Sequence, residues 1–112
     1  MLEHTQHQDG VVTILAVKGR LDAVAAPELR PTIEELVAGN CKYVVFDLDE
    51  LAMIDSSGVG AIVSLFKRLR MKDGDVKIAR LQGQPKEIFR LLRLDRAFDL
   101  FDDLPAAISS FK

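Results

Sequence analysis

The chain has 112 residues, of which 48% are hydrophobic and 29% charged, and its formal net charge is −2. This length predicts one domain, residues 1–112, that can bury its own core, and the weak acidic balance excludes the basic surface of a nucleic-acid-binding protein. Because the sequence has neither an apolar run of roughly 20 residues, as a membrane span needs, nor a signal peptide, and because its single cysteine, Cys41, cannot form an intrachain disulfide, we expect a cytoplasmic protein.

The first third of the chain predicts two strands and a helix. Residues 2–8 could form an edge strand, Asp9-Gly10 predicts a hairpin turn, and residues 11–18 indicate a largely buried second strand. A helix is expected from about Pro27, which suits a first helical turn, until Gly39-Asn40 ends it. Its apolar face would carry Leu29, Ile33, Leu36 and Val37.

The middle of the chain predicts a buried strand followed by a helix. Residues 43–48 are apolar and rich in β-branched and aromatic types, as buried strands are. From about Ser57 the pattern changes to a helical period, which Asp73-Gly74 interrupts. One apolar stripe of this helix consists of Ile62, Leu65, Phe66 and Leu69.

The last third of the chain continues the alternation of strands and helices. Residues 76–79 predict a strand, Pro85 the start of a third helix, Leu100-Phe101 a short strand and Pro105 the start of a last helix. The apolar side of the third helix would consist of Ile88, Phe89, Leu91 and Leu92. This order predicts an α/β domain with a mixed sheet of about four to five strands and about four helices.

The segment Met53–Gly60 is the candidate functional site, because it places two hydroxyls, a carboxylate and two glycines at the start of a helix. A helix N-terminus offers free N–H donors and a partial positive charge, so a serine there could cap the helix or carry a phosphate. A purely structural role is the alternative. In that case Asp55 is a local cap, while Gly58 and Gly60 allow tight turning and close packing of the helix on the sheet.

Catalytic interpretations of the same segment fail on spacing. The glycines lack the third small residue of a dinucleotide fingerprint and the lysine of a P-loop. Neither Ser56 nor Ser57 has glycines two residues before and two after it, as a serine elbow requires. The only histidines, His4 and His7, lie in the predicted edge strand and are expected to be solvated. We therefore expect that the protein is not an enzyme.

Acidic residues could instead form a metal site after the buried strand. Asp47, Asp49, Glu50 and Asp55 together could hold Mg²⁺. The alternative is that Asp49 and Glu50 are solvated loop charges and that Asp55 is a cap or turn residue. We favour this alternative and expect neither a metal nor a cofactor.

Three segments resemble a known family. Phe46-Asp47-Leu48 followed by Met53–Gly60, with Gly19-Arg20-Leu21-Asp22 earlier in the chain, is similar to the signature of the STAS domain, specifically the bacterial anti-sigma factor antagonists. Residue 20 is often acidic in such proteins and is Arg20 here. The resemblance implies that Ser56 is phosphorylated by a partner anti-sigma factor that is also a serine kinase. A phosphatase of the PP2C type would reverse the modification.

The resemblance also implies a partner-switching function. Unmodified, the domain would bind the anti-sigma factor and free a sigma factor; phosphorylated, it would dissociate. The implied partner-binding residues are Asp22, Asp55, Ser57, Gly58, Val59, Val63 and Lys67. Val59 and Val63 are either exposed contacts for the partner or partly covered core. The alternative function within the family is a scaffold or regulatory subunit of a signalling or lipid-transport complex.

Overall fold

The fold begins with a β-hairpin. The computed structural model describes residues 1–111. Strands β1 (Leu2–Asp9) and β2 (Val12–Leu21) pair antiparallel along their whole lengths, with Leu2 opposite Gly19 and Asp9 opposite Val12. Gly10 at the turn has a φ of 61°, a left-handed conformation that glycine adopts without strain. The predicted edge strand and hairpin turn are confirmed.

The remaining strands add to β2 in parallel. The sheet order is β1-β2-β3-β5-β6, while the short strand β4 pairs with the far end of β2. These strands are β3 (Tyr43–Asp47), β4 (Leu51–Ile54), β5 (Asp75–Ala79) and β6 (Leu100–Phe101). Since neighbouring parallel strands need crossover connections, helices lie between β2 and β3, between β4 and β5, and between β5 and β6 in the chain.

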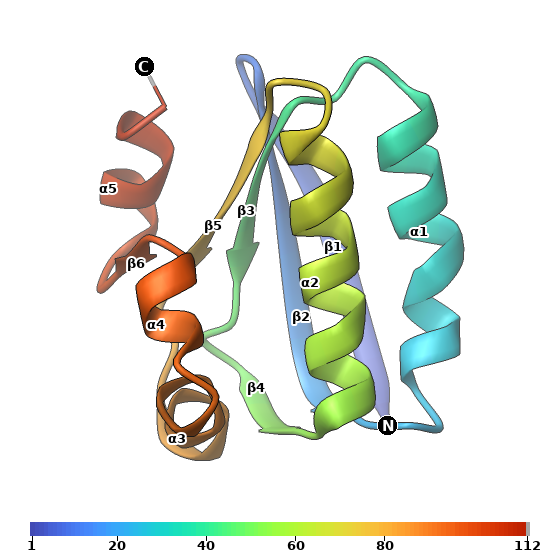
Figure 1. The fold of residues 1–112 in the computed structure, drawn as a ribbon, viewed down its shortest axis with the longest axis vertical. Helices are drawn as coiled ribbons and strands as arrows, with labels where there is room; N and C mark the ends of the chain where they lie inside the picture. The colour runs from blue at the N-terminus through green and yellow to red at the C-terminus, as the bar shows by residue number, and fades with distance from the viewer. Residues whose placement is uncertain (112) are drawn as a thin grey trace.

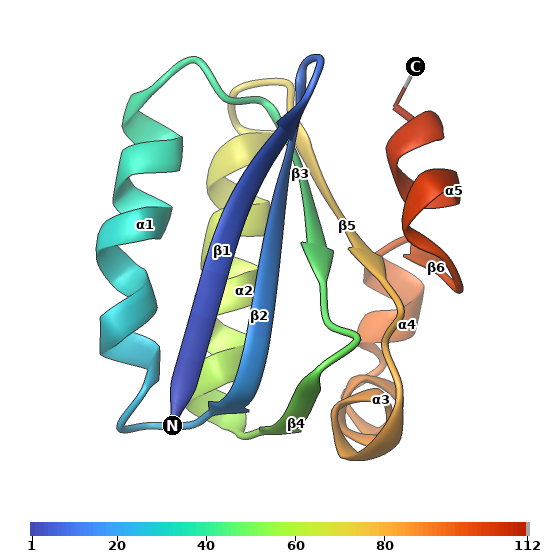
Figure 2. The same ribbon diagram turned by 180° about the vertical axis from the view of Figure 1, so that it is seen from behind.

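Helices cover the two faces of the sheet unequally. α1 (Ala26–Ala38) and α2 (Ser56–Arg70) lie side by side on one face (Figure 1). Seen from behind, β1 and β2 carry no helix in front of them (Figure 2). The last helix, α5 (Leu104–Ser109), packs on this opposite face near β5 and β6. The short helices α3 (Gly83–Leu91) and α4 (Leu94–Ala97) lie between β5 and β6 in the chain.

Both faces of the central strands are buried, which explains their continuous apolar runs. Alternate side chains of each strand point to opposite faces. The residues toward α1 and α2 are Leu15, Val17, Val44, Phe46, Val76 and Ile78. The residues toward α5 are Val12, Ile14, Val45 and Ala79, which pack with Ala107 and Ile108.

The C-terminal ends of α1 and α2 are joined by side chains. Lys72, just past α2, donates from Nζ to the carbonyl oxygens of Val37 (2.6 Å) and Gly39 (2.9 Å). These bonds satisfy carbonyl groups that have no partner within α1. One turn before Lys72, Arg68 of α2 forms an ion pair with Glu34 of α1. The two helices are thus held together at the end away from Ser56.

The mixed α/β architecture is confirmed, but two short elements were not predicted. Within residues 1–111 the structure has six strands and five helices. β4 has only four residues, of which Leu51 and Ile54 are buried, so its pattern is too short to recognise. α4 is a single turn that follows Arg93, whose φ of 59° is left-handed.

The expected apolar side of the third helix is wrong in part. Phe89 is fully buried, whereas Leu91 is 74% and Leu92 53% exposed. Leu91 lies about 200° around the helix from Phe89, because each residue turns a helix by about 100°. Leu92 follows the last residue of the helix. The short helix therefore covers the core with one turn only.

Candidate functional site

Asp55 organises the start of α2. Its backbone is extended, and its Oδ1 accepts hydrogen bonds from the backbone N–H groups of Ser57 (2.9 Å) and Gly58 (3.1 Å). It is therefore the N-cap of the helix, a position where aspartate is among the preferred residues. The structural role expected for Asp55 is confirmed, and neither serine is needed as the cap.

The same carboxylate holds the loop that leads into α1. Oδ2 of Asp55 accepts from the backbone N–H of Ala23 at 3.0 Å. In the loop itself, Oδ1 of Asp22 accepts from Val24 (3.1 Å) and Ala25 (3.0 Å). The hydrogen bond from Ala25 is the main reason that the pKa of Asp22 lies below its usual value. Asp22 and Asp55, 33 positions apart in sequence, thus meet at one end of the molecule.

Gly58 is required by close packing. A Cβ built at this position would lie 2.2 Å from the carbonyl oxygen of Leu21 and 2.7 Å from Cγ1 of Ile54. Both distances are shorter than any ordinary contact, so only glycine fits. Gly60 is different, because a Cβ there would meet no atom within 4 Å. The expected packing role is therefore confirmed for Gly58 and wrong for Gly60.

The two serines of the segment are accessible. Ser56 and Ser57 are exposed, and among residues 1–111 neither hydroxyl forms a hydrogen bond. Ser56 is the first residue of α2, where the partial positive charge of the helix terminus is strongest. A group attached to its Oγ would face solvent at that terminus.

The proposed partner face of α2 needs a correction. Val59 is only 8% exposed and belongs to the main core, so the expectation of an exposed contact is wrong for this residue. Val63 is half-buried and packs against the same core, while Lys67 is exposed. The buried face of α2 is wide because the helix packs on the sheet and also against α1. On its other side, the ring of Phe66 packs against that of Phe98, with 4.4 Å between the ring centroids.

One residue at the site has no local sequence signal. Gln84, in the first turn of α3, pairs its side-chain amide with the backbone of Ile54: Oε1 accepts from N at 2.9 Å and Nε2 donates to O at 3.0 Å. The amide group occupies the place of a neighbouring strand. It fixes the residue directly before Asp55 from 30 positions away in the sequence.

The acidic residues at the end of β3 and just after it form ion pairs with basic side chains. Asp47 is buried and forms two hydrogen bonds with Arg80, at 2.9 and 2.6 Å, which raise the pKa of that guanidinium. Asp49 lies 3.7 Å from the same arginine, and Glu50 pairs with Lys18 at 2.9 Å. Within residues 1–111, no group of three or more potential ligands could hold a metal ion. The side chains of Asp49 and Glu50 are 43% and 60% exposed, so they are solvated loop charges as expected, and each also has a cationic partner.

The histidines lie in β1, as expected, but they differ in environment. His4 is half-buried, with Nε2 3.1 Å from the hydroxyl of Thr32 in α1, so it is not fully solvated. His7 is exposed.

None of the helices in the described part of the chain has the length and apolarity needed to cross a bilayer.

The chain is similar to a known protein family over most of its length. The model of the STAS domain family matches residues 4–107. A curated relative, the anti-sigma F factor antagonist of Paenibacillus polymyxa, is 23% identical over 108 residues, which are 96% of this chain and 92% of the relative.

Solved structures share the fold. The structure of an anti-sigma factor antagonist from Mycobacterium paratuberculosis superimposes with a TM-score of 0.89 at 23% identity, covering 98% of this chain and 93% of the other. The phosphorylated form of SpoIIAA, a Bacillus cell fate determinant, superimposes with a TM-score of 0.79 at 17% identity. The match covers 98% of this chain and 100% of the SpoIIAA chain.

Proposed function

The chain belongs to the STAS domain family, and we propose that it is an anti-sigma factor antagonist whose partner binding is switched by phosphate on Ser56. The observation that carries the proposal is the exposed Ser56 hydroxyl at the first position of α2, beside a cap already supplied by Asp55. The name of the Paenibacillus relative supports the same function. The proposed partners are an anti-sigma factor with serine kinase activity and a PP2C-type phosphatase.

The switch would act at the interface and leave the fold intact. A phosphate adds about −1.5 to −2 charges and strong acceptor oxygens. In the free domain the terminus of α2 favours this charge. In the complex, however, the partner would have to desolvate a dianion beside the carboxylate of Asp55, where the unmodified domain offers a hydroxyl. Phosphorylation would therefore release the anti-sigma factor, which could then bind its sigma factor again.

We expect the cognate kinase to phosphorylate Ser56 and not Ser57. Incubation with kinase and ATP, followed by trypsin, gives the peptide Tyr43–Lys67, which contains both serines and Ser64. Fragmentation of this peptide in the mass spectrometer assigns the site. Ser57→Ala should still accept phosphate, and Ser56→Ala should not. Phosphate on Ser57 alone would contradict the assignment.

Replacing Ser56 with aspartate should leave the domain folded while weakening partner binding. The free energy of unfolding should stay within about 1 kcal/mol of wild type, since a negative charge in the first helical turn gains about 0.3–1 kcal/mol, opposed by repulsion from Asp55. Thermal melting measures this, and calorimetric titration measures binding. Ser56→Ala is the control, which should fold and bind. A variant that fails to fold would mean that Ser56 has a structural role.

A further inference from the structure

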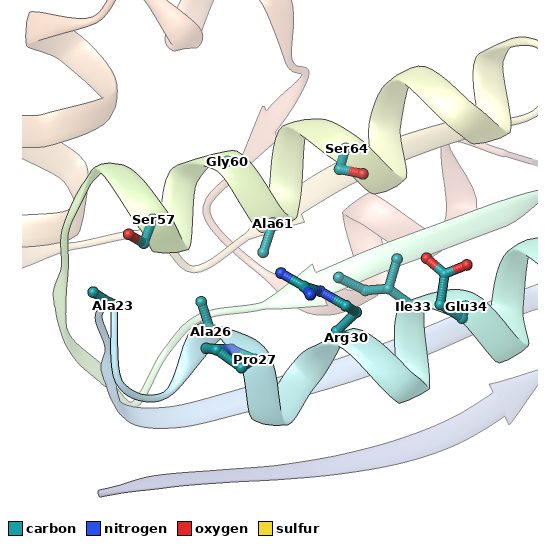
Figure 3. A pocket seen from close by; sticks show the side chains of 10 residues that line it. All are labelled: Ala23, Ala26, Pro27, Arg30, Ile33, Glu34, Ser57, Gly60, Ala61 and Ser64. Carbon is teal, nitrogen blue, oxygen red and sulfur yellow. The ribbon is translucent and has the colours of Figure 1, made fainter.

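A groove opens between α1 and α2 at the end of the molecule that carries the serines (Figure 3). Its volume is about 380 Å³. The wall contributed by α2 consists of small residues, Ser57, Gly60, Ala61 and Ser64, which leave room that larger side chains would fill. The groove thus starts at the residue next to Ser56 and runs along the helix pair.

Among the described residues that line this groove, Arg30 is the one cation and Glu34 the one anion. The side chain of Arg30 extends from α1 toward α2 (Figure 3) and, among residues 1–111, has no acidic group within ion-pair distance. The acid one turn further along α1, Glu34, is held by two hydrogen bonds from Arg68. These bonds are the main reason that the pKa of Glu34 is lowered, and the charge of Arg30 contributes less. Arg30 therefore attracts Glu34 without a direct ion pair, and its guanidinium can still pair with a carboxylate from outside.

We propose that the groove receives an acidic side chain of the anti-sigma factor, with its carboxylate paired to Arg30. This inference rests on the proposed function. A kinase that reaches Oγ of Ser56 must also cover Ser57, which lies at the start of the groove. Covering an unpaired guanidinium costs free energy unless the partner brings an opposite charge. A carboxylate meets this need, because it can accept two parallel hydrogen bonds from one arginine.

Calorimetric titration with charge variants tests the inference. The probe is a recombinant anti-sigma factor of the serine-kinase type, the partner class proposed above. Arg30→Glu should raise the Kd of the unmodified domain about tenfold or more, Arg30→Gln by a smaller factor, and Arg30→Lys least. The matched control is Arg96→Glu, at an exposed arginine of α4, which should bind like wild type.

The outcomes separate this inference from the proposed function. If wild type binds and phosphorylation releases it, but Arg30→Glu and Arg30→Gln bind normally, the groove inference alone is overturned. If wild type does not bind the probe, both fall. A concentration-dependent dimer that Arg30→Glu abolishes would overturn the inference and assign the groove to a second copy of the chain. Thermal melting accompanies each variant. If repulsion between Glu at position 30 and Glu34 lowers stability, Arg30→Gln decides the result.

Discussion

Gly58→Ala is expected to destabilise the domain by about 2–3 kcal/mol, the upper part of the range typical of overpacking in a close-packed interior. The added Cβ would lie 2.2 Å from the carbonyl oxygen of Leu21 and 2.8 Å from its Cγ. A backbone carbonyl at the end of β2 cannot rotate away as a flexible side chain can. The start of α2 must therefore shift away from β2, which also strains the hydrogen bond that the Ala23 N–H donates to Asp55. Chemical denaturation measures the loss.

Gly60→Ala is the matched control and should have the opposite effect. The position is exposed, lies within the same helix, and has no atom within 4 Å of a built Cβ. Alanine there should stabilise the domain by about 0.5–1 kcal/mol, because glycine loses more backbone freedom on folding. Two identical substitutions two residues apart thus differ in sign. If both variants had the same stability, the close contact between Gly58 and Leu21 would be wrong.

Much of the fold could be predicted because its signals are local. The hairpin turn at Asp9-Gly10 needs only two residues, and the buried strands at the centre of the sheet show as apolar runs. β4 could not be predicted, since its pairing with β2 and its support by Gln84 both depend on residues far away in sequence. Leu91 is exposed against expectation because its spacing of three residues from Ile88 suggests a longer apolar face than this short helix buries.

In the candidate site, too, local features could be predicted from the sequence, whereas contacts between distant segments could not. The cap at Asp55 and the exposed serine after it follow from the order of residues at a helix start. The bond between Asp55 and Ala23, and the groove at Arg30, arise only when α1 lies beside α2. The sequence alone does not show which residues of the two helices face each other, so it cannot predict where small side chains leave a groove. These features had to come from the structure.

Val59 shows how a helical pattern can mislead. Val59, Val63 and Lys67 are spaced four residues apart, which suggests that they share one outward face of the helix. Val59 is also three residues before Ile62, however, and the two share the face that packs on the sheet. Because α2 is flanked by α1 and by Phe98, its buried arc includes Val59 completely and Val63 in part. If the proposed partner contacts α2, we therefore expect it to do so at more exposed positions such as Ser57, Gly60 and Lys67.

Val59→Asp is accordingly expected to unfold the domain or to lower its free energy of unfolding by about 3–5 kcal/mol, because it leaves a buried charge without a partner. Leu65→Ala, at a fully buried position of the same helix, sets the scale of a core loss at about 2–5 kcal/mol. Ser64→Asp introduces the same charge at an exposed position and should change stability by less than about 1 kcal/mol. Thermal and denaturant unfolding of the three variants would compare them directly. If Val59→Asp were as stable as wild type and lost only partner binding, Val59 would lie on the surface, and the packing of α2 described here would be wrong.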